Sequence, residues 1–235
     1  MRTRLPFPIL HEDSEVIVID KPAGMLTTRT RAKETNTAEE WLNDYVRKGQ
    51  LKSRRHVWLV HRLDRETSGV MMFAKTEETA EWFRANWSEL TEKTYLARVE
   101  GVLAEKSGVF ESWLQEDPDG YRVRSVPVPF RPSGRSRPVK LSRTDWRRLS
   151  VDRGTTLVEV TLRSGRKNQI RVHFSEAGHP VVGDVKYGGK RADRLHLHSL
   201  RLRFRHPRTG DWLAFTSPSN PSSLSNPSNH KGAQK

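Results

Sequence analysis

Short apolar runs along the chain predict a series of β-strands. The first, residues 15–20, is rich in β-branched side chains and ends at the turn-forming stretch Lys21–Gly24. Comparable runs predict five further strands, at residues 57–60, 70–74, 94–99, 157–162 and 197–204. The run at residues 57–60 leads the chain directly to His61.

Three helices are predicted from capping residues and apolar spacing. Residues 38–47 follow a threonine suited to cap a helix, and they begin with two glutamates where the helix dipole favours acids. Residues 77–90 follow another threonine and carry three large aromatic side chains suited to a core face. Residues 169–177 predict a shorter helix, which the Gly-His-Pro sequence just after it would end.

The order of these elements indicates the fold class. Strands outnumber helices and do not alternate with them regularly, which disfavours a doubly wound parallel sheet. We therefore expect an α+β fold with a mixed, mainly antiparallel sheet flanked by helices and loops. Residues 127–138, rich in Pro, Arg and Ser, predict an exposed loop, and residues 217–235 predict a disordered Ser/Asn/Pro-rich tail. Residues 1–216 are expected to form a single domain.

Composition narrows the class of protein. The chain has 235 residues and no run of about 18 apolar residues, the length that a membrane-spanning helix needs. Its N-terminus breaks on prolines without the apolar core of a secretory signal. The lack of cysteine excludes disulfides and cysteine-based zinc sites, and no acidic partner recurs near the histidines at ligand spacing. We therefore expect a cytoplasmic, monomeric protein without a bound metal.

Positive charge is concentrated in two segments. The chain has 42 Lys and Arg against 28 Asp and Glu, a formal net charge of +14. Residues 121–154 carry eight more basic than acidic side chains, and residues 190–208 carry six more. Such clusters neutralise phosphates and are typical of a nucleic-acid-binding surface. A generally basic, solvated face is the alternative that charge alone leaves open.

A carboxylate between two arginines follows the strand predicted at residues 57–60. In the run His-Arg-Leu-Asp-Arg, Asp64 lies between Arg62 and Arg65. Extended geometry would place Arg62 and Asp64 on one face and Leu63 on the other. The neighbouring cations favour an ionised Asp64 that can act as a nucleophile or a base. Taken alone, the same pattern also fits a structural ion pair at a strand end.

Several motifs in order along the chain resemble those of one enzyme family. The run at residues 61–75, His-Arg-Leu-Asp-Arg-Glu-Thr-Ser-Gly-Val-Met-Met-Phe-Ala-Lys, is similar to the signature of the RluA-type pseudouridine synthases. Residues 21–27, the Lys-Thr-Tyr stretch at 93–101, the Gly-Arg-Lys-Asn-Gln-Ile-Arg stretch at 165–173, and residues 178–188 resemble the family's other motifs. The joint occurrence of these motifs identifies the chain as a member of that family.

The resemblance implies a reaction and roles for named residues. The family isomerises uridine in RNA to pseudouridine without a cofactor, on a uridine flipped out of an rRNA or tRNA stem-loop. Asp64 corresponds to its essential carboxylate, Tyr95 to the aromatic residue that packs on the target base, and Arg171 to the cation that pairs with the carboxylate. Arg62 corresponds to the residue that replaces the flipped base. The further residues expected to contact substrate are His61, Arg65, Gly165, Arg166 and Ile170.

Some alternatives remain at this point. Tyr95 also fits an ordinary core position, Arg171 a phosphate contact, and Ile170 simple packing. Asn168 stands where the common motif has His, which leaves the local hydrogen bonding open. The first motif begins near residue 21, so we expect no separate S4-like RNA-binding domain. A non-catalytic RNA-binding protein and a glycoside hydrolase are the competing functions; the hydrolase needs a second acid, for which Glu66 is the only nearby candidate.

Overall fold

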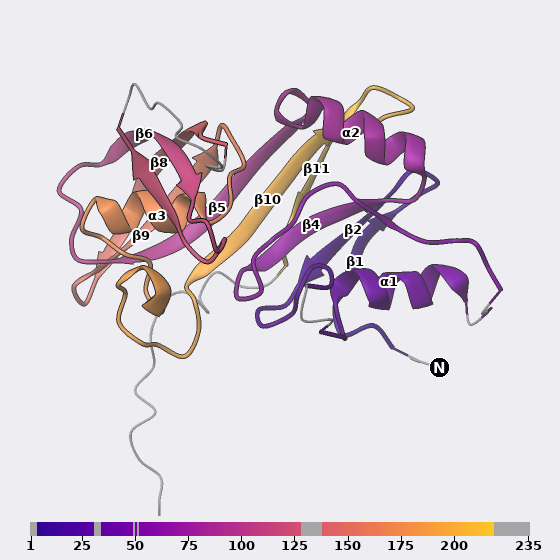
Figure 1. Cartoon of the computed structure of the whole chain (residues 1–235), viewed down its shortest axis with the longest axis horizontal. Helices are drawn as coiled ribbons and strands as arrows, with labels where there is room; N and C mark the ends of the chain where they lie inside the picture. The colour runs from indigo at the N-terminus through magenta and orange to yellow at the C-terminus, as the bar shows by residue number, and fades with distance from the viewer. Residues whose placement is uncertain (1–3, 31–33, 49, 51, 128–137, 219–235) are drawn as a thin grey trace, which may run out of the picture.

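The described residues of this computed structural model, 4–30, 34–48, 50, 52–127 and 138–218, form one continuous sheet with three α-helices (Figure 1). The strands are β1 (Ile9–Glu12), β2 (Val16–Lys21), β3 (Trp58–Leu59), β4 (Ser68–Ala74), β5 (Thr91–Glu100), β6 (Ser107–Glu116), β7 (Val123–Val126), β8 (Lys140–Asp152), β9 (Thr155–Leu162), β10 (Leu197–Arg205) and β11 (Trp212–Thr216). The helices are α1 (Ala38–Arg47), α2 (Glu77–Leu90) and α3 (Gln169–Glu176), with a 3-10 turn η1 (Val185–Tyr187). The loop predicted at 127–138 and the tail predicted at 217–235 lie almost wholly outside these residues.

The sheet is mixed and mainly antiparallel, as predicted. Its strand order is β1-β2-β4-β10-β5-β9-β8-β6-β7, with β11 paired to β10 and β3 paired to β4. Among the described residues, the pairing of β4 with β10 is parallel and the other named strand pairs are antiparallel. The α+β fold class expected from the sequence is therefore confirmed.

Apolar side chains of β2 and β4 are buried on both faces of the sheet. Ile17 and Ile19 of β2 join one core with α1 and α3, whereas Val16 and Val18 join a second core with Phe83 of α2. Successive strand residues point to opposite faces, so an unbroken apolar run is what a strand covered on both sides requires. Figure 1 shows α1 and α2 on opposite sides of this half of the sheet, and α3 packed on the other half.

The helices begin where their caps predict. The Thr37 side chain accepts a hydrogen bond from the Glu40 N–H, and the Glu40 carboxylate accepts one from the Thr37 N–H, which completes a capping box. Thr76 caps α2 in the same way by accepting from the Thr79 N–H. Within the described chain, no helix is long and apolar enough to cross a bilayer.

Two parts of the strand prediction differ from the structure. The strand expected at residues 57–60 is only the two-residue β3, which pairs with β4, the strand expected at residues 70–74. Strands β1, β6, β7, β8 and β11 were not predicted. The long β8 illustrates why, because its inward Ser142 and Thr144 are polar and its outward Arg143 and Arg147 are charged, which leaves no apolar alternation to recognise.

The fold brings the ends of several elements to the middle of the sheet. β5 and β10 run side by side through its centre. The segment that precedes β4, the end of β9 and the start of α3 meet beside them. Residues from five separate stretches of sequence therefore line one pocket.

Candidate active site

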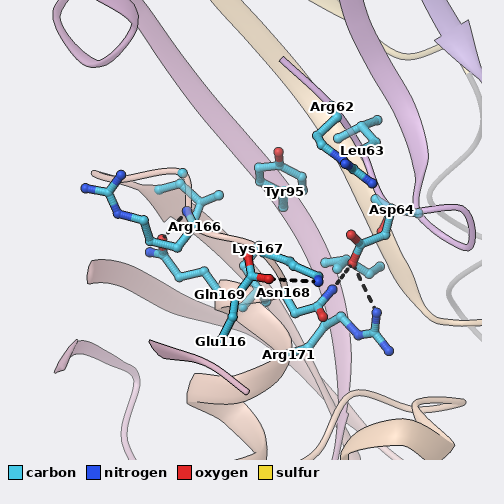
Figure 2. A pocket seen from close by; sticks show the side chains of 15 residues that line it. Arg62, Leu63, Asp64, Tyr95, Glu116, Arg166, Lys167, Asn168, Gln169 and Arg171 are labelled. Carbon is cyan, nitrogen blue, oxygen red and sulfur yellow. Dashed lines mark hydrogen bonds and ion pairs between the residues drawn. The ribbon is translucent and has the colours of Figure 1, made fainter. Parts of the chain in front are cut away.

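A cavity of about 230 Å³ opens where these elements meet (Figure 2). Its walls come from the segment before β4, from β5 and β10, from the ends of β6 and β9, and from the first turn of α3 with the loop that leads into it. The lining residues are Arg62, Leu63, Asp64, Thr67, Tyr95, Glu116, Leu162, Gly165, Arg166, Lys167, Asn168, Gln169, Ile170, Arg171 and Leu197. Seven of the nine predicted site residues thus line one cavity, and the two exceptions are His61 and Arg65.

Asp64 is presented by an irregular segment rather than by a strand. Leu63, which is 4% exposed, is held through its backbone: its N–H donates to Thr27 Oγ1 at 3.2 Å, and its carbonyl accepts from the same hydroxyl at 2.8 Å. The Thr67 N–H then donates to the Asp64 carbonyl at 3.1 Å and closes a turn. Residues 61–64 belong to no strand, and the Asp64 side chain points into the pocket (Figure 2).

A buried lysine supports the turn that carries Asp64. Lys21 is 1% exposed, and its ammonium group donates to the carbonyl oxygens of Pro22, Met25 and Arg65 at 2.9, 2.7 and 3.2 Å. Three carbonyl acceptors match the three donors of an ammonium group. Burial lowers the pKa of Lys21 to about 7, while the nearby charges of Glu66 and Asp64 act in the opposite direction.

Arg171 joins Asp64 to a second carboxylate. Its Nε and Nη2 donate to Asp184 at 2.6 and 2.7 Å, and its Nη1 donates to Asp64 Oδ2 at 3.0 Å. Burial alone lowers the pKa of this guanidinium, but the hydrogen bonds and charges of Asp184 and Asp64 outweigh that effect and raise it. The planar bidentate pair with Asp184 fixes the direction in which Arg171 reaches Asp64.

Asn168 makes a second contact with the same carboxylate oxygen. Its Nδ2 donates to Asp64 Oδ2 at 2.5 Å (Figure 2). Asn168 and Arg171 thus both hold Oδ2, whereas Oδ1 of Asp64 receives no hydrogen bond from the described residues. The Asp64 side chain is 26% exposed. This arrangement leaves one carboxylate oxygen anchored and the other available to a molecule in the cavity.

Tyr95 contributes an aromatic wall. It lies on β5, is 7% exposed, and belongs both to the main core and to the lining of the pocket. The two interpretations of Tyr95 from the sequence, core residue and site residue, are therefore compatible. Burial raises the pKa of Tyr95 to about 12, and the charge of Asp64 acts in the same direction. The phenol consequently stays protonated at neutral pH.

Two predicted substrate contacts lie outside the cavity. Arg65 is exposed and forms an ion pair with Glu34. The His61 ring stacks on Trp87 with a centroid separation of 4.6 Å, and its Nε2 accepts a hydrogen bond from the Met72 N–H at 3.0 Å. These two side chains share the motif with Asp64, but their directions do not support contact with a molecule bound in the pocket.

Acid should destabilise the folded protein through His61. Burial, helped by the charge of Lys93, lowers the pKa of His61 from 6.5 to about 3. As pH falls below 6.5, the unfolded chain therefore gains a proton that the folded protein excludes, and stability falls by at most about 1.4 kcal/mol per pH unit. Urea unfolding between about pH 7 and 5 measures this loss.

The matched variant for this prediction is His61→Gln, whose side-chain oxygen can still accept the Met72 N–H. It should flatten the slope of stability against pH below 6.5. A smaller slope should persist, because burial also lowers the pKa of His173 to about 4. A slope identical to that of the unmodified protein would contradict the assignment to His61.

Asp184, Asn168, Lys186 and Tyr187 are the site residues that sequence reasoning missed. Asp184 and Tyr187 fall within the motif-like residues 178–188, which is the signal that could have found them. Asn168 was noted only as a departure from the common motif. In the described part of the chain, no three His, Asp or Glu side chains gather to form a metal site.

The family model described as RNA pseudouridylate synthase matches residues 15–176 of this chain, a span that includes Asp64, Tyr95 and Arg171. The chain belongs to this family. The membership expected from the sequence motifs is thereby confirmed, and the family's matched region contains both the carboxylate and the guanidinium that meet in the pocket.

Named family members resemble most of the chain. A ribosomal large subunit pseudouridine synthase D from Nitrosomonas europaea is 34% identical over 226 residues, which cover 91% of this chain and 62% of that protein. This chain therefore spans less than two thirds of that relative. A tRNA pseudouridine synthase C from Haemophilus ducreyi is 33% identical, with 86% of each chain covered.

A solved structure of a human family member shares the fold. The protein titled RNA Pseudouridylate Synthase Domain Containing 4 aligns with a TM-score of 0.72 and 23% identity, over 92% of this chain and 90% of that chain. The continuous mixed sheet described above is therefore the family's fold.

Proposed function

We propose that this chain isomerises uridine to pseudouridine in structured RNA, with Asp64 as the carboxylate that acts on the target nucleotide. The observation that carries the proposal is the state of this side chain: Oδ2 is held by Asn168 and Arg171, and Oδ1 faces the cavity without a partner among the described residues. The relatives' names point to an rRNA or tRNA substrate, and we propose a stem-loop of one of these.

The reaction rearranges one nucleotide without gain or loss of atoms. The bond from ribose C1′ to N1 of uracil breaks, the base rotates, and C1′ bonds to C5, whose hydrogen leaves while N1 gains one. Asp64 Oδ1 is the group available to attack the nucleotide as a nucleophile or to remove a proton from it. The Tyr95 ring supplies a flat apolar surface for the base, and its high pKa keeps it uncharged.

The target must leave the RNA stack to enter this cavity. A base held inside stacked structure cannot present its glycosidic bond to a buried side chain, so flipping is physically required. Arg62 is exposed at the cavity wall, and we propose that it occupies the space that the base vacates. Its planar guanidinium can stack on the neighbouring bases.

Basic side chains surround the pocket. Arg166 and Lys167 line it and are exposed, and Arg143 and Arg147 are exposed on β8. These positions support electrostatic binding of the RNA backbone by the catalytic unit itself. They belong to the basic clusters or motifs recognised in the sequence.

Release of tritium from RNA labelled at C5 of uridine tests this proposal. The purified protein should release tritium from rRNA or tRNA that lacks its own modification, because C5 exchanges its hydrogen for the ribose bond. Digestion of the product should yield pseudouridine. RNA binding without tritium release from any cellular RNA would favour the non-catalytic alternative, and release of free uracil would indicate a hydrolase.

A further inference from the structure

We infer that Asn168 is a positioning residue that sets the rotation of the Asp64 carboxylate and so keeps Oδ1 directed at the substrate. The inference rests on the proposed role of Asp64 and extends it to a residue whose type departs from the common motif. Asn168 itself is 8% exposed and is argued to act through Asp64.

The hydrogen bonds of Asn168 admit only one orientation of its amide. Oδ1 of Asn168 accepts from Lys186 Nζ at 3.2 Å and from the Tyr187 hydroxyl at 3.1 Å, while Nδ2 donates to Asp64 at 2.5 Å. An ammonium group cannot accept a hydrogen bond, and an ionised carboxylate cannot donate one. A flipped amide would therefore lose its bonds to Lys186 and to Asp64, so the surroundings hold the donor toward Asp64.

The position of Asn168 on α3 supports the same role. Asn168 is the N-cap residue of α3, a position where an Asn side chain ordinarily accepts a hydrogen bond from the first turn. Here it makes no such bond, and the side chain is directed to Asp64 instead. Arg171 lies one turn further along the same helix, so both donors to Asp64 Oδ2 come from a single rigid element.

The backbone conformation explains which side chains suit this position. Asn168 has a φ of 52°, in the left-handed region that Asn, Asp and His adopt more readily than other non-glycine residues. Asn and His also both carry a side-chain N–H donor. The motif His and this Asn thus meet the same two requirements, but an amide does not titrate, so the donor here is independent of pH.

Three substitutions to residues that tolerate the left-handed backbone distinguish loss of the hydrogen-bond donor from loss of the fold. Asn168→Gly removes the side chain, and kcat for tritium release should fall roughly ten- to a hundredfold, with little change in the KM for RNA. Asn168→His restores a donor and should recover most of that loss. Asn36→Gly is the matched control, because Asn36 has a φ of 66° and does not line the pocket; it should leave kcat unchanged.

Asn168→Asp tests the contact through charge. It places a second carboxylate against Asp64, among charged and titratable groups from several elements. These groups are Lys21, Tyr95, Lys167, Arg171, Asp184, Lys186 and Tyr187. Like charges disfavour joint ionisation, so the acidic limb of the kcat profile should move up by about one pH unit or more. A residue needed only for folding would lower the thermal midpoint without moving this limb.

Either of two results would overturn the inference at once: Asn168→Gly with an unchanged kcat, or Asn168→Asp with an unmoved acidic limb. A fall in kcat for Asn168→Gly that simply follows a fall in the thermal midpoint would do the same. Failure of the underlying function is distinguishable, because it would appear as full activity in Asp64→Asn or as no tritium release by the unmodified protein.

Discussion

Asp64→Asn is expected to lower tritium release from C5-labelled RNA by about 10⁴-fold or more, the scale on which loss of an essential catalytic group acts. The amide has nearly the same shape as the carboxylate, so the fold should persist. It carries no charge, however, and it neither attacks carbon nor takes up a proton at neutral pH. Single-turnover assays with excess enzyme measure the chemical step directly.

The control for Asp64→Asn is Glu66→Gln. Glu66 lies two residues further along, is exposed, and does not line the cavity. It is also the second acid that a hydrolase would need. This variant should keep the activity of the unmodified protein, and both variants should bind RNA with unchanged affinity. Substantial tritium release by Asp64→Asn, or its loss in Glu66→Gln, would refute the assignment of the carboxylate.

Arg171→Met is expected to damage both stability and activity. It leaves Asp184, whose side chain is fully buried, without its bidentate partner, and it removes one of the two donors to Asp64. Loss of one member of a buried ion pair costs about 3–5 kcal/mol, because the remaining charge is left unpaired. Urea denaturation measures that loss, and tritium release should fall at least about a hundredfold through the misplaced carboxylate.

A second substitution separates the two effects. Asp184→Asn added to Arg171→Met removes the isolated buried charge and should recover part of the lost stability. Activity should not recover, because Asp64 still lacks the guanidinium. If the single variant proved as stable as the unmodified protein, or if the double variant regained activity, Arg171 would not be the joint support of both carboxylates.

The apolar strands and the capped helices were predictable because their signals are local. The apolar run of β2 indicates burial on both faces of the sheet, and Thr37 with Glu40 indicates where α1 begins. The polar strand β8 was missed because its burial comes from neighbours that are distant in sequence. Its Thr144, for example, is buried through hydrogen bonds with His173 and Gln169.

The distinction between local sequence signals and contacts made by distant residues applies to the candidate site as well. The motifs pointed to Asp64, Tyr95 and Arg171, and the structure brings them to one cavity. His61 and Arg65 lie next to the same motif in sequence but do not line the cavity, because their side chains contact Met72 and Glu34 instead.

The sequence by itself determined the family, the fold class and the identity of the candidate carboxylate, since each is recorded in short runs of residues. Only the tertiary structure decided which oxygen of Asp64 is held and which is free. The donors Asn168 and Arg171 lie 104 and 107 residues from Asp64 along the chain. The direction of a hydrogen bond depends on how the folded backbone places both partners, and no local pattern of residues encodes that.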